Sequence, residues 1–153
     1  MARAGFTAIG SGKLKFGRDG LWYSDDEVIP NRAIRRLFSR ALQVLPDGRG
    51  RLELGEDCAD VVIEDTPWVV VRVDGDPAHG FTVTLNDDTS EPLDPAGLRV
   101  GAANVLYCRV KGGRHEARFL RPAYYELARH ADAGGDGAIA LRVGDRRIPI
   151  AGS

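Results

Sequence analysis

Several arginines gather on one side of a predicted helix in the first third of the chain. With a step of about 100° per residue, the arc contains Arg32, Arg35, Arg36 and Arg40. Guanidinium groups bind carboxylates and phosphates through two parallel hydrogen bonds, which ammonium groups do less well. We therefore expect Arg32, Arg36 and Arg40 to contact an anionic small molecule or an acidic protein segment. The alternative is a solvated helix face that pairs with acidic residues of the same chain.

A second set of polar and aromatic residues opens another predicted helix near residue 121. Pro122 is favoured in the first turn of a helix, and the backbone N–H groups there attract anions, with Arg121 adding a positive charge. Tyr124 and Tyr125 lie about 100° apart, so one of them exposes its hydroxyl. We expect Arg121 and Tyr125 to contact the ligand. The alternative is a helix started by proline whose tyrosine hydroxyls are satisfied locally.

An acidic and aromatic turn joins two predicted strands in the middle of the chain. The run from Asp65 to Pro67 is typical of a tight turn, because Asp and Thr hydrogen-bond the backbone and Pro fixes φ. An exposed tip made of Glu64, Asp65 and Trp68 could meet a protein partner. The alternative is ordinary turn chemistry, with Trp68 buried against the helices.

The sequence contains no common catalytic or metal-binding pattern. Gly10-Ser11-Gly12-Lys13 lacks the earlier glycine and the following Ser or Thr of a phosphate-binding loop. Neither zinc nor calcium spacing is found among His79, His115, His130, Asp74, Asp76, Asp87 and Asp88. Cys58 and Cys108 are 50 residues apart and are expected to be reduced thiols. We therefore expect no cofactor, no metal and no catalytic residues.

The elements that must position these residues belong to an α+β fold. Alternating residues and Asp-Gly or Asp-Asp turns predict three strands between residues 13 and 29. Asn31 is the predicted N-cap of an amphipathic helix of about four turns. The apolar face of this helix is predicted to contain Ile34, Leu37, Phe38, Ala41 and Leu45. Strands are predicted at 59–64, 67–73, 81–85, 104–110 and 116–120, a helix from 121, and a closing hairpin over 138–141 and 147–150.

The first and last thirds share an order of hairpin, helix, Gly-rich turn and hairpin. Leu21-Trp22-Tyr23 corresponds to Val105-Leu106-Tyr107 in this comparison. We therefore predict two similar hairpin–helix–hairpin motifs from an internal duplication, packed into one compact unit. Residues 1–12 are expected to form a flexible N-terminal segment before a single domain, 13–153, with related halves of about 13–75 and 98–153.

Composition and charge fit a globular chain of 153 residues, with 43% apolar and 28% charged residues. Residues 1–51 and 99–153 each carry a net charge of +5, whereas residues 52–98 carry −11. This layout can neutralise itself within one fold or across a symmetric dimer. The overall charge of −1 gives no general attraction to nucleic acid. The apolar stretch 66–71 is too short to span a membrane, and no secretory signal is found, so we expect a cytoplasmic protein.

From Lys13 to the C-terminus, the chain resembles the uncharacterised bacterial family called domain of unknown function 1285. The resemblance rests on the segments Arg18-Asp19-Gly20-Leu21-Trp22-Tyr23, Leu37-Phe38-Ser39-Arg40, Val62-Ile63-Glu64-Asp65-Thr66-Pro67-Trp68 and Arg121-Pro122-Ala123-Tyr124-Tyr125-Glu126-Leu127. It implies an α+β fold of two similar hairpin-and-helix motifs and a link to signal transduction, without an enzyme activity. Residues 55–58 depart from the family pattern.

These observations favour a non-catalytic binding or regulatory module that recognises an anionic ligand or an acidic protein segment. One alternative is a hydrolase or transferase with a site between the two halves, built from Glu64, Asp65 and a tyrosine. Another is a structural protein whose charge blocks assemble a homodimer.

Overall fold

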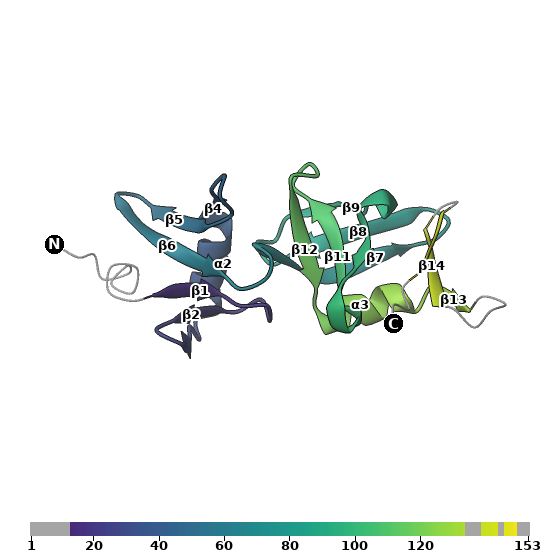
Figure 1. The fold of residues 1–153 in the computed structure, drawn as a ribbon, viewed down its shortest axis with the longest axis horizontal. Helices are drawn as coiled ribbons and strands as arrows, with labels where there is room; N and C mark the ends of the chain where they lie inside the picture. Colours follow the sequence, from purple (N-terminus) through teal and green to yellow (C-terminus); the bar gives the residue numbers. More distant parts are fainter. Residues whose placement is uncertain (1–12, 134–138, 144–145, 150–153) are drawn as a thin grey trace. The chain divides into compact units, whose positions relative to one another are not determined.

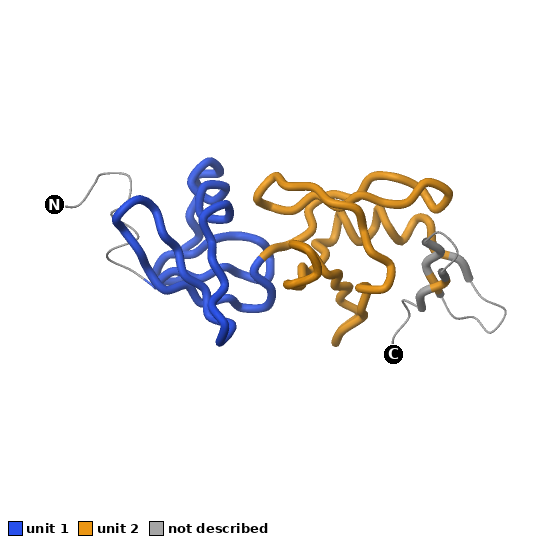
Figure 2. Tube along the Cα trace, turned by 90° about the horizontal axis from the view of Figure 1, so that it is seen from above, with its two compact units in different colours: residues 1–67 blue, residues 68–153 orange. Residues whose placement is uncertain are grey.

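Strands joined by tight turns dominate the computed structural model, which describes residues 13–133, 139–143 and 146–149 (Figure 1). The chain divides between Pro67 and Trp68 into two compact units, residues 1–67 (unit 1) and 68–153 (unit 2), blue and orange in Figure 2. This boundary does not coincide with the predicted halves 13–75 and 98–153. Unit 1 carries 10 basic and 11 acidic residues and unit 2 carries 11 of each, so each unit is nearly neutral by itself.

Unit 1 is a six-stranded sheet with one helix. Its elements are β1 (Leu14–Phe16), β2 (Trp22–Ser24), β3 (Glu27–Val28), α2 (Arg32–Ala41), β4 (Leu42–Val44), β5 (Gly50–Leu54) and β6 (Asp57–Ile63). The strand order is β3-β2-β1-β6-β5-β4, and β1 and β6 form its parallel pair. The sheet therefore consists of two antiparallel meanders, β1–β3 and β4–β6, joined at their first and last strands.

Unit 2 contains a second six-stranded sheet, one helix and a small third sheet. The six-stranded sheet and its connections are β7 (Trp68–Asp76), β8 (Gly80–Leu85), β9 (Ser90–Pro92), the 3₁₀ turn η2 (Pro95–Gly97), β10 (Arg99–Val100), the 3₁₀ turn η3 (Ala102–Asn104), β11 (Leu106–Val110) and β12 (His115–Phe119). The remaining elements are α3 (Arg121–Ala128), β13 (Ala131–Ala133), β14 (Ile139–Val143) and β15 (Arg146–Pro149). The closing hairpin expected near the C-terminus corresponds to β14 and β15.

The two large sheets have the same strand order. The second sheet runs β10-β11-β12-β7-β8-β9, and read from the β9 edge this is the order of the first sheet with six added to every strand number. Its first strand, β7, also pairs in parallel with its last strand, β12. The fold class is α+β as expected, and the two similar sheets suggest a duplicated unit.

The repeat has a different phase from the one predicted. By position in the sheets, β2 corresponds to β8, so Leu21-Trp22-Tyr23 does not correspond to Val105-Leu106-Tyr107 in β11. The order meander, helix, meander does occur twice along the chain, around α2 and around α3. The meanders around α2 join one sheet, whereas those around α3 lie in two different sheets. Shared aromatic residues suggested that these two segments correspond, but the order of strand pairing shows which strands are equivalent.

The turns follow their sequence signals. Asp25 and Asp26 both adopt left-handed backbone conformations, with φ of 51° and 68°, as a two-residue hairpin turn requires. Asn31 caps α2 by accepting a hydrogen bond from the Ile34 backbone N–H at 3.1 Å. The helix is shorter than predicted and ends at Ala41, because Leu42 begins a strand and pairs with Leu52.

The core of unit 1 forms between its sheet and α2. Trp22 lies between Phe16 and Phe38, with ring centroids 5.3 Å apart in both pairs, and its Nε1 donates to Ser39 Oγ at 2.9 Å. Phe38 and Ser39 are the buried residues of α2. Leu37 was predicted to face the core, but its side chain is 41% exposed. The helix is therefore rotated so that a buried serine satisfies a buried indole.

The core of unit 2 forms where α3 packs on β7. Ala123 and Leu127 are the buried residues of α3, and Val70 and Leu85 are buried and paired in the sheet below. No helix in the described part of the chain is long and apolar enough to cross a membrane.

Candidate ligand-binding site

Unit 2 contains a pocket of about 340 Å³ at the start of α3. It is lined by Ala103, Asn104, Val105, Leu106, Arg118, Phe119, Arg121, Tyr124 and Tyr125. Two of the residues predicted from the sequence to bind a ligand, Arg121 and Tyr125, therefore meet in one cavity. This size lies at the small end of the usual range for small-molecule sites, about 300–1,000 Å³.

The end of β12 and the first turn of α3 supply the polar side of the pocket. Arg118 and Phe119 are neighbours in β12, so they point to opposite faces of the sheet. Arg121 follows at the first position of α3, and Pro122 lies in the first turn. No side chain caps this helix end, where the aligned peptide dipoles give a partial positive charge. Arg121 and the helix dipole thus place positive potential at one end of the cavity.

The loop before β11 supplies the opposite side. Ala103 and Asn104 both have left-handed backbone conformations, with φ of 57° and 61°. Val105 then returns the chain to extended geometry, and its N–H donates to the Ala102 carbonyl at 3.2 Å. Leu106 and Phe119 are buried and lie in the neighbouring strands β11 and β12, so the base of the pocket is apolar.

The two tyrosines form an aromatic corner. Their ring centroids are 5.6 Å apart and the ring planes meet at 68°. Tyr124 is half-buried, whereas Tyr125 is 58% exposed. The expectation that one of the two exposes its hydroxyl corresponds to Tyr125.

Several basic side chains of unit 2 form ion pairs. Arg99 contacts Glu116 through two hydrogen bonds of 2.8 and 2.9 Å, Arg72 pairs with Asp74 at 3.0 Å, and Arg129 pairs with Glu126 at 3.2 Å. In unit 1, the backbone N–H of Arg18 donates to the Glu64 carboxylate at 2.8 Å. These contacts favour neutralisation of the charge blocks within each unit.

The arginines of α2 lie in unit 1. Arg32 and Arg40 are exposed, and Arg36 is half-buried. Arg35, which the helical arc also included, donates to the backbone carbonyls of Ile29 and Pro30 at 2.8 and 2.7 Å, so its guanidinium holds the chain before the helix. The pocket of unit 2 is thus lined by Arg121 and Tyr125 but not by the α2 arginines.

The turn predicted to meet a partner is the connection between the units. Asp65 is exposed, and Glu64 is held in unit 1 by the Arg18 backbone. Trp68 is only 7% exposed and lies in unit 2, where the Lys111 ammonium is 4.9 Å and the His115 ring 5.3 Å from its ring centre. Its indole belongs to the core, as the alternative interpretation held, rather than to an exposed tip.

Among the described residues of unit 2, Asp87 carries the most buried carboxylate, in the turn after β8. It accepts from Lys111 Nζ at 2.6 Å, from the Thr89 hydroxyl at 2.6 Å and from the Thr89 backbone N–H at 3.0 Å. Burial raises the pKa of Asp87, but the hydrogen bonds from Lys111 and Thr89 outweigh it, and the net pKa is lowered. Hydrogen bonds from Lys111 and Thr89 satisfy the Asp87 carboxylate, so its role is to stabilise the turn.

Metal-binding and thiol groups do not add to the pocket. Among the residues that the structure describes, no group of three or more His, Cys, Asp or Glu side chains could hold a metal ion. Cys58 and Cys108 are free thiols, and Cys108 is buried in the core of unit 2.

Sequence patterns identified only part of the pocket. Arg118 and Leu106 come from strands whose pairing the sequence predicted, but nothing in their spacing marked them as ligand contacts. Asn104 reaches the pocket through a left-handed loop conformation, which Asn tolerates better than most residues. That tolerance, just before an apolar strand, is the one local signal that could have pointed to it.

The fold and the pocket define an α+β protein made of two six-stranded sheets with the same strand order. Solved proteins of the DUF1285 family share this fold. One, from Silicibacter pomeroyi DSS-3, superposes with a TM-score of 0.67 over 90% of this chain and 78% of its own, at 23% sequence identity. Another, from Shewanella baltica OS155, has a TM-score of 0.60 over 78% of this chain and 92% of its own, at 18% identity. The resemblance to domain of unknown function 1285 is therefore supported by the fold. No protein-family model and no curated protein matches the chain.

Proposed function

We propose that the protein is a non-catalytic binding module whose second unit holds a small anionic ligand in the pocket at the start of α3. The observation that supports this proposal is a cavity whose lining combines Arg121, at the first position of α3, with an amide and two tyrosines. A few polar groups in a concave site fix the orientation of a small-molecule ligand. A regulatory role in the bacterial cytoplasm, within signal transduction, is the context that the resemblance to DUF1285 favours.

The charge of the pocket supports an anion in particular. Among the described residues that line it, Arg118 and Arg121 carry the charges, and both are positive at any physiological pH. A carboxylate or phosphate can accept two hydrogen bonds from the Arg121 guanidinium, and such charge-assisted bonds are stronger than neutral ones. The helix end adds a smaller attraction of the same sign.

A thermal-shift panel of inorganic phosphate, nucleotides, cyclic dinucleotides and small carboxylates tests the proposal on the full chain. A ligand that binds only the folded state adds about 2.7 kcal/mol to the free energy of unfolding at 100 times its Kd. We expect a shift with at least one of these anions, and its loss in Arg121→Gln. The matched control is Arg129→Gln, which removes an exposed guanidinium of the same region that pairs with Glu126. Equal shifts in both variants would place the anion elsewhere.

The α2 arginines offer a second candidate surface, for an acidic protein segment. Its support is the exposed Leu37 on the helix that carries Arg32, Arg36 and Arg40. A variant with Arg36→Glu and Arg40→Glu separates the two candidates, because it leaves the pocket of unit 2 intact. If this variant abolishes the shift that Arg121→Gln leaves unchanged, the binding surface is α2.

The enzyme and homodimer alternatives stay predictions with their own tests. A hydrolase or transferase that used Glu64, Asp65 and a tyrosine would turn over a substrate and lose that turnover in Asp65→Asn. A homodimer held by charge blocks would dissociate as salt rises, because exposed pairs are screened beyond a Debye length of about 8–10 Å. Sedimentation at low and high salt measures this directly.

A further inference from the structure

The lining of the pocket disfavours ligands that bear a cationic group. The described residues that line it include two arginines and no Asp or Glu. The nearest acidic residue of α3 in sequence, Glu126, pairs with Arg129 at 3.2 Å. A ligand ammonium would therefore lose its hydration near the Arg121 guanidinium and would find no carboxylate among these lining residues, which is costly. A zwitterion such as a free amino acid is a poor ligand for this site.

The aromatic corner selects for a flat ring. Tyr124 and Tyr125 meet at 68°, so a planar ligand can stack on one ring while its edge faces the other. Offset-stacked and edge-to-face contacts are the two arrangements that aromatic rings prefer. The exposed fraction of Tyr125, 58%, leaves most of its ring available for such a contact. Leu106 and Phe119 provide an apolar base beneath.

The volume limits the ligand to one or two rings. A cavity of about 340 Å³ is close to the lower bound for small-molecule sites, about 300 Å³, so an extended ligand would project into solvent. Within this volume the anionic group and the ring must be separated by a short linker, because the arginines and the tyrosines line the same small space.

We propose that the pocket binds a planar aromatic carboxylate that bears no cationic group. This inference rests on the proposed function and specifies its ligand class. Arg121 holds the carboxylate, and the ring lies against Tyr124 and Tyr125 over the apolar base. Tyr125 is then a determinant of specificity, whereas Arg121 is a determinant of affinity for every anion.

Titration calorimetry on the full chain with four probes tests this inference. Indole-3-acetate is the aromatic carboxylate, tryptophan adds an ammonium on a chain one carbon longer, cyclohexylacetate replaces the flat ring by a smaller saturated one, and inorganic phosphate is an anion without a ring. We expect indole-3-acetate to bind at least about tenfold more tightly than tryptophan. We expect it to bind about fivefold more tightly than cyclohexylacetate, because stacking is lost there.

Two variants locate the interaction. Tyr125→Ala should weaken indole-3-acetate about fivefold and leave phosphate unchanged, whereas Tyr125→Phe should retain both affinities. Arg121→Gln should weaken both probes. Because Tyr125 is largely exposed, its replacement is not expected to unfold the protein, and the melting temperature of each variant checks this.

The outcomes separate this inference from the proposed function. If tryptophan or cyclohexylacetate binds as tightly as indole-3-acetate, the ligand class is wrong but anion binding holds. If phosphate binds through Arg121 while indole-3-acetate does not bind, the same conclusion follows. If no anion binds, the proposed function fails as well.

Discussion

The ammonium of Lys111 lies 2.6 Å from the carboxylate of Asp87, so an ion pair joins two turns of unit 2 that are 24 residues apart in sequence. The side chain of Asp87 is only 5% exposed and that of Lys111 22% exposed. Thr89 completes the cluster, because its hydroxyl donates to Asp87 and accepts from Lys111 at 3.1 Å. The turn after β8 and the turn after β11 are thereby held together.

Removing one partner of this pair should destabilise the protein strongly. We expect Asp87→Asn or Lys111→Met to lower the free energy of unfolding by about 3–5 kcal/mol, because each leaves a poorly compensated buried charge or polar group. The double variant should cost less than the sum of the two. Urea denaturation measures all three. The control is Asp74→Asn in the exposed pair with Arg72, for which we expect at most about 1 kcal/mol. Equal costs at Asp74 and Asp87 would contradict a buried pair.

The same carboxylate should make stability depend on pH in the acid range. Although burial raises the pKa of Asp87, the hydrogen bonds from Lys111 and Thr89 prevail, so the folded pKa lies below the ordinary value of 3.8. The unfolded state therefore binds protons first, and the free energy of unfolding falls as pH drops through 3.8 towards the folded pKa. Above 3.8 the full contribution is present.

Denaturation series from pH 6 to pH 3 in the protein and in Asp87→Asn measure this difference. We expect the stability gap between them to shrink as pH falls. Asp47 and Asp76, whose pKa values are also lowered by hydrogen bonds, occur in both proteins and cancel in the comparison. A gap that is constant with pH would show that Asp87 does not titrate on unfolding.

The orientation of α2 can be checked by two neighbouring substitutions. Phe38→Ala should cost about 3–5 kcal/mol, because the Phe38 ring is buried against Trp22. Leu37→Ala should cost less than about 1 kcal/mol, because Leu37 is largely exposed. Urea midpoints of the two variants decide the matter. If Leu37→Ala is as costly as Phe38→Ala, the helix faces the core with the side that the hydrophobic pattern predicted.

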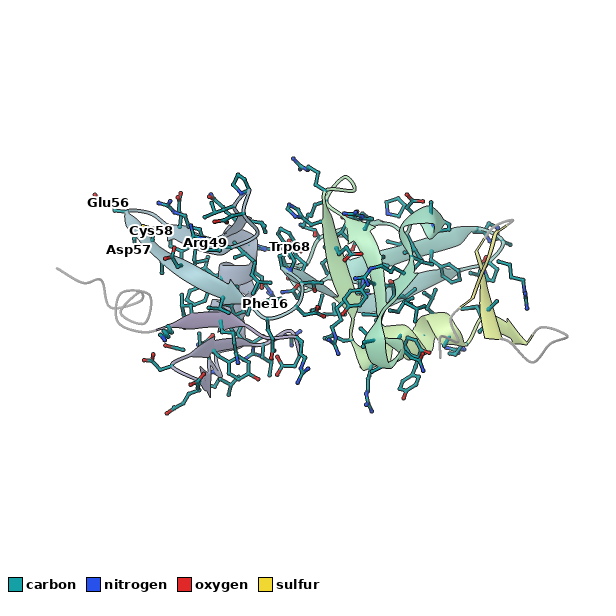
Figure 3. The ribbon with its side chains drawn as sticks, in the orientation of Figure 1. Phe16, Arg49, Glu56, Asp57, Cys58 and Trp68 are labelled. Carbon is teal, nitrogen blue, oxygen red and sulfur yellow. The ribbon has the colours of Figure 1, made fainter. Side chains whose placement is uncertain are left out.

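The two cysteines should differ sharply in reactivity. Cys58 is exposed near the tip of the β5–β6 hairpin, beside Glu56 and Asp57 (Figure 3). Cys108 is fully buried, and burial, with smaller effects of Glu91 and Glu116, raises the pKa of its thiol to about 12. We expect a thiol reagent at pH 8 to modify one thiol in the native protein and two in urea. Cys58→Ser should abolish the native reaction, and reaction of both thiols in the native state would contradict burial of Cys108.

Local sequence signals predicted most strands and turns, because hairpin turns depend on a few residues. Asp25-Asp26 forms a turn because both residues adopt left-handed backbone conformations, which Asp tolerates. The predicted end of α2 was wrong because Leu42 pairs with Leu52, ten residues later, and this strand pairing outweighs the helical pattern that continues past Ala41. The predicted orientation of α2 was wrong because Ser39, a polar residue, lies in the core and accepts a hydrogen bond from the Trp22 indole.

Local sequence signals likewise predicted only part of the candidate site. Arg121 and Tyr125 share a helix turn, so their spacing already placed them together. Arg118 joins them because β12 leads directly into α3, and Asn104 joins them through a loop with no repeat or spacing to mark it. The pairing of Asp87 with Lys111 depends on two hairpins that meet across the sheet, which neither segment shows by itself.

The parallel pairing of the first and last strands has a consequence for how each sheet can be completed. In each six-stranded sheet the first and the last strand along the chain lie side by side in the middle of the sheet, not at its edge. A truncation that removed either of these two strands would therefore split the sheet and create two new edges, whereas loss of an edge strand would not. During synthesis, unit 1 can close only after β6 has emerged, at residue 63, so it is expected to fold as a whole rather than strand by strand.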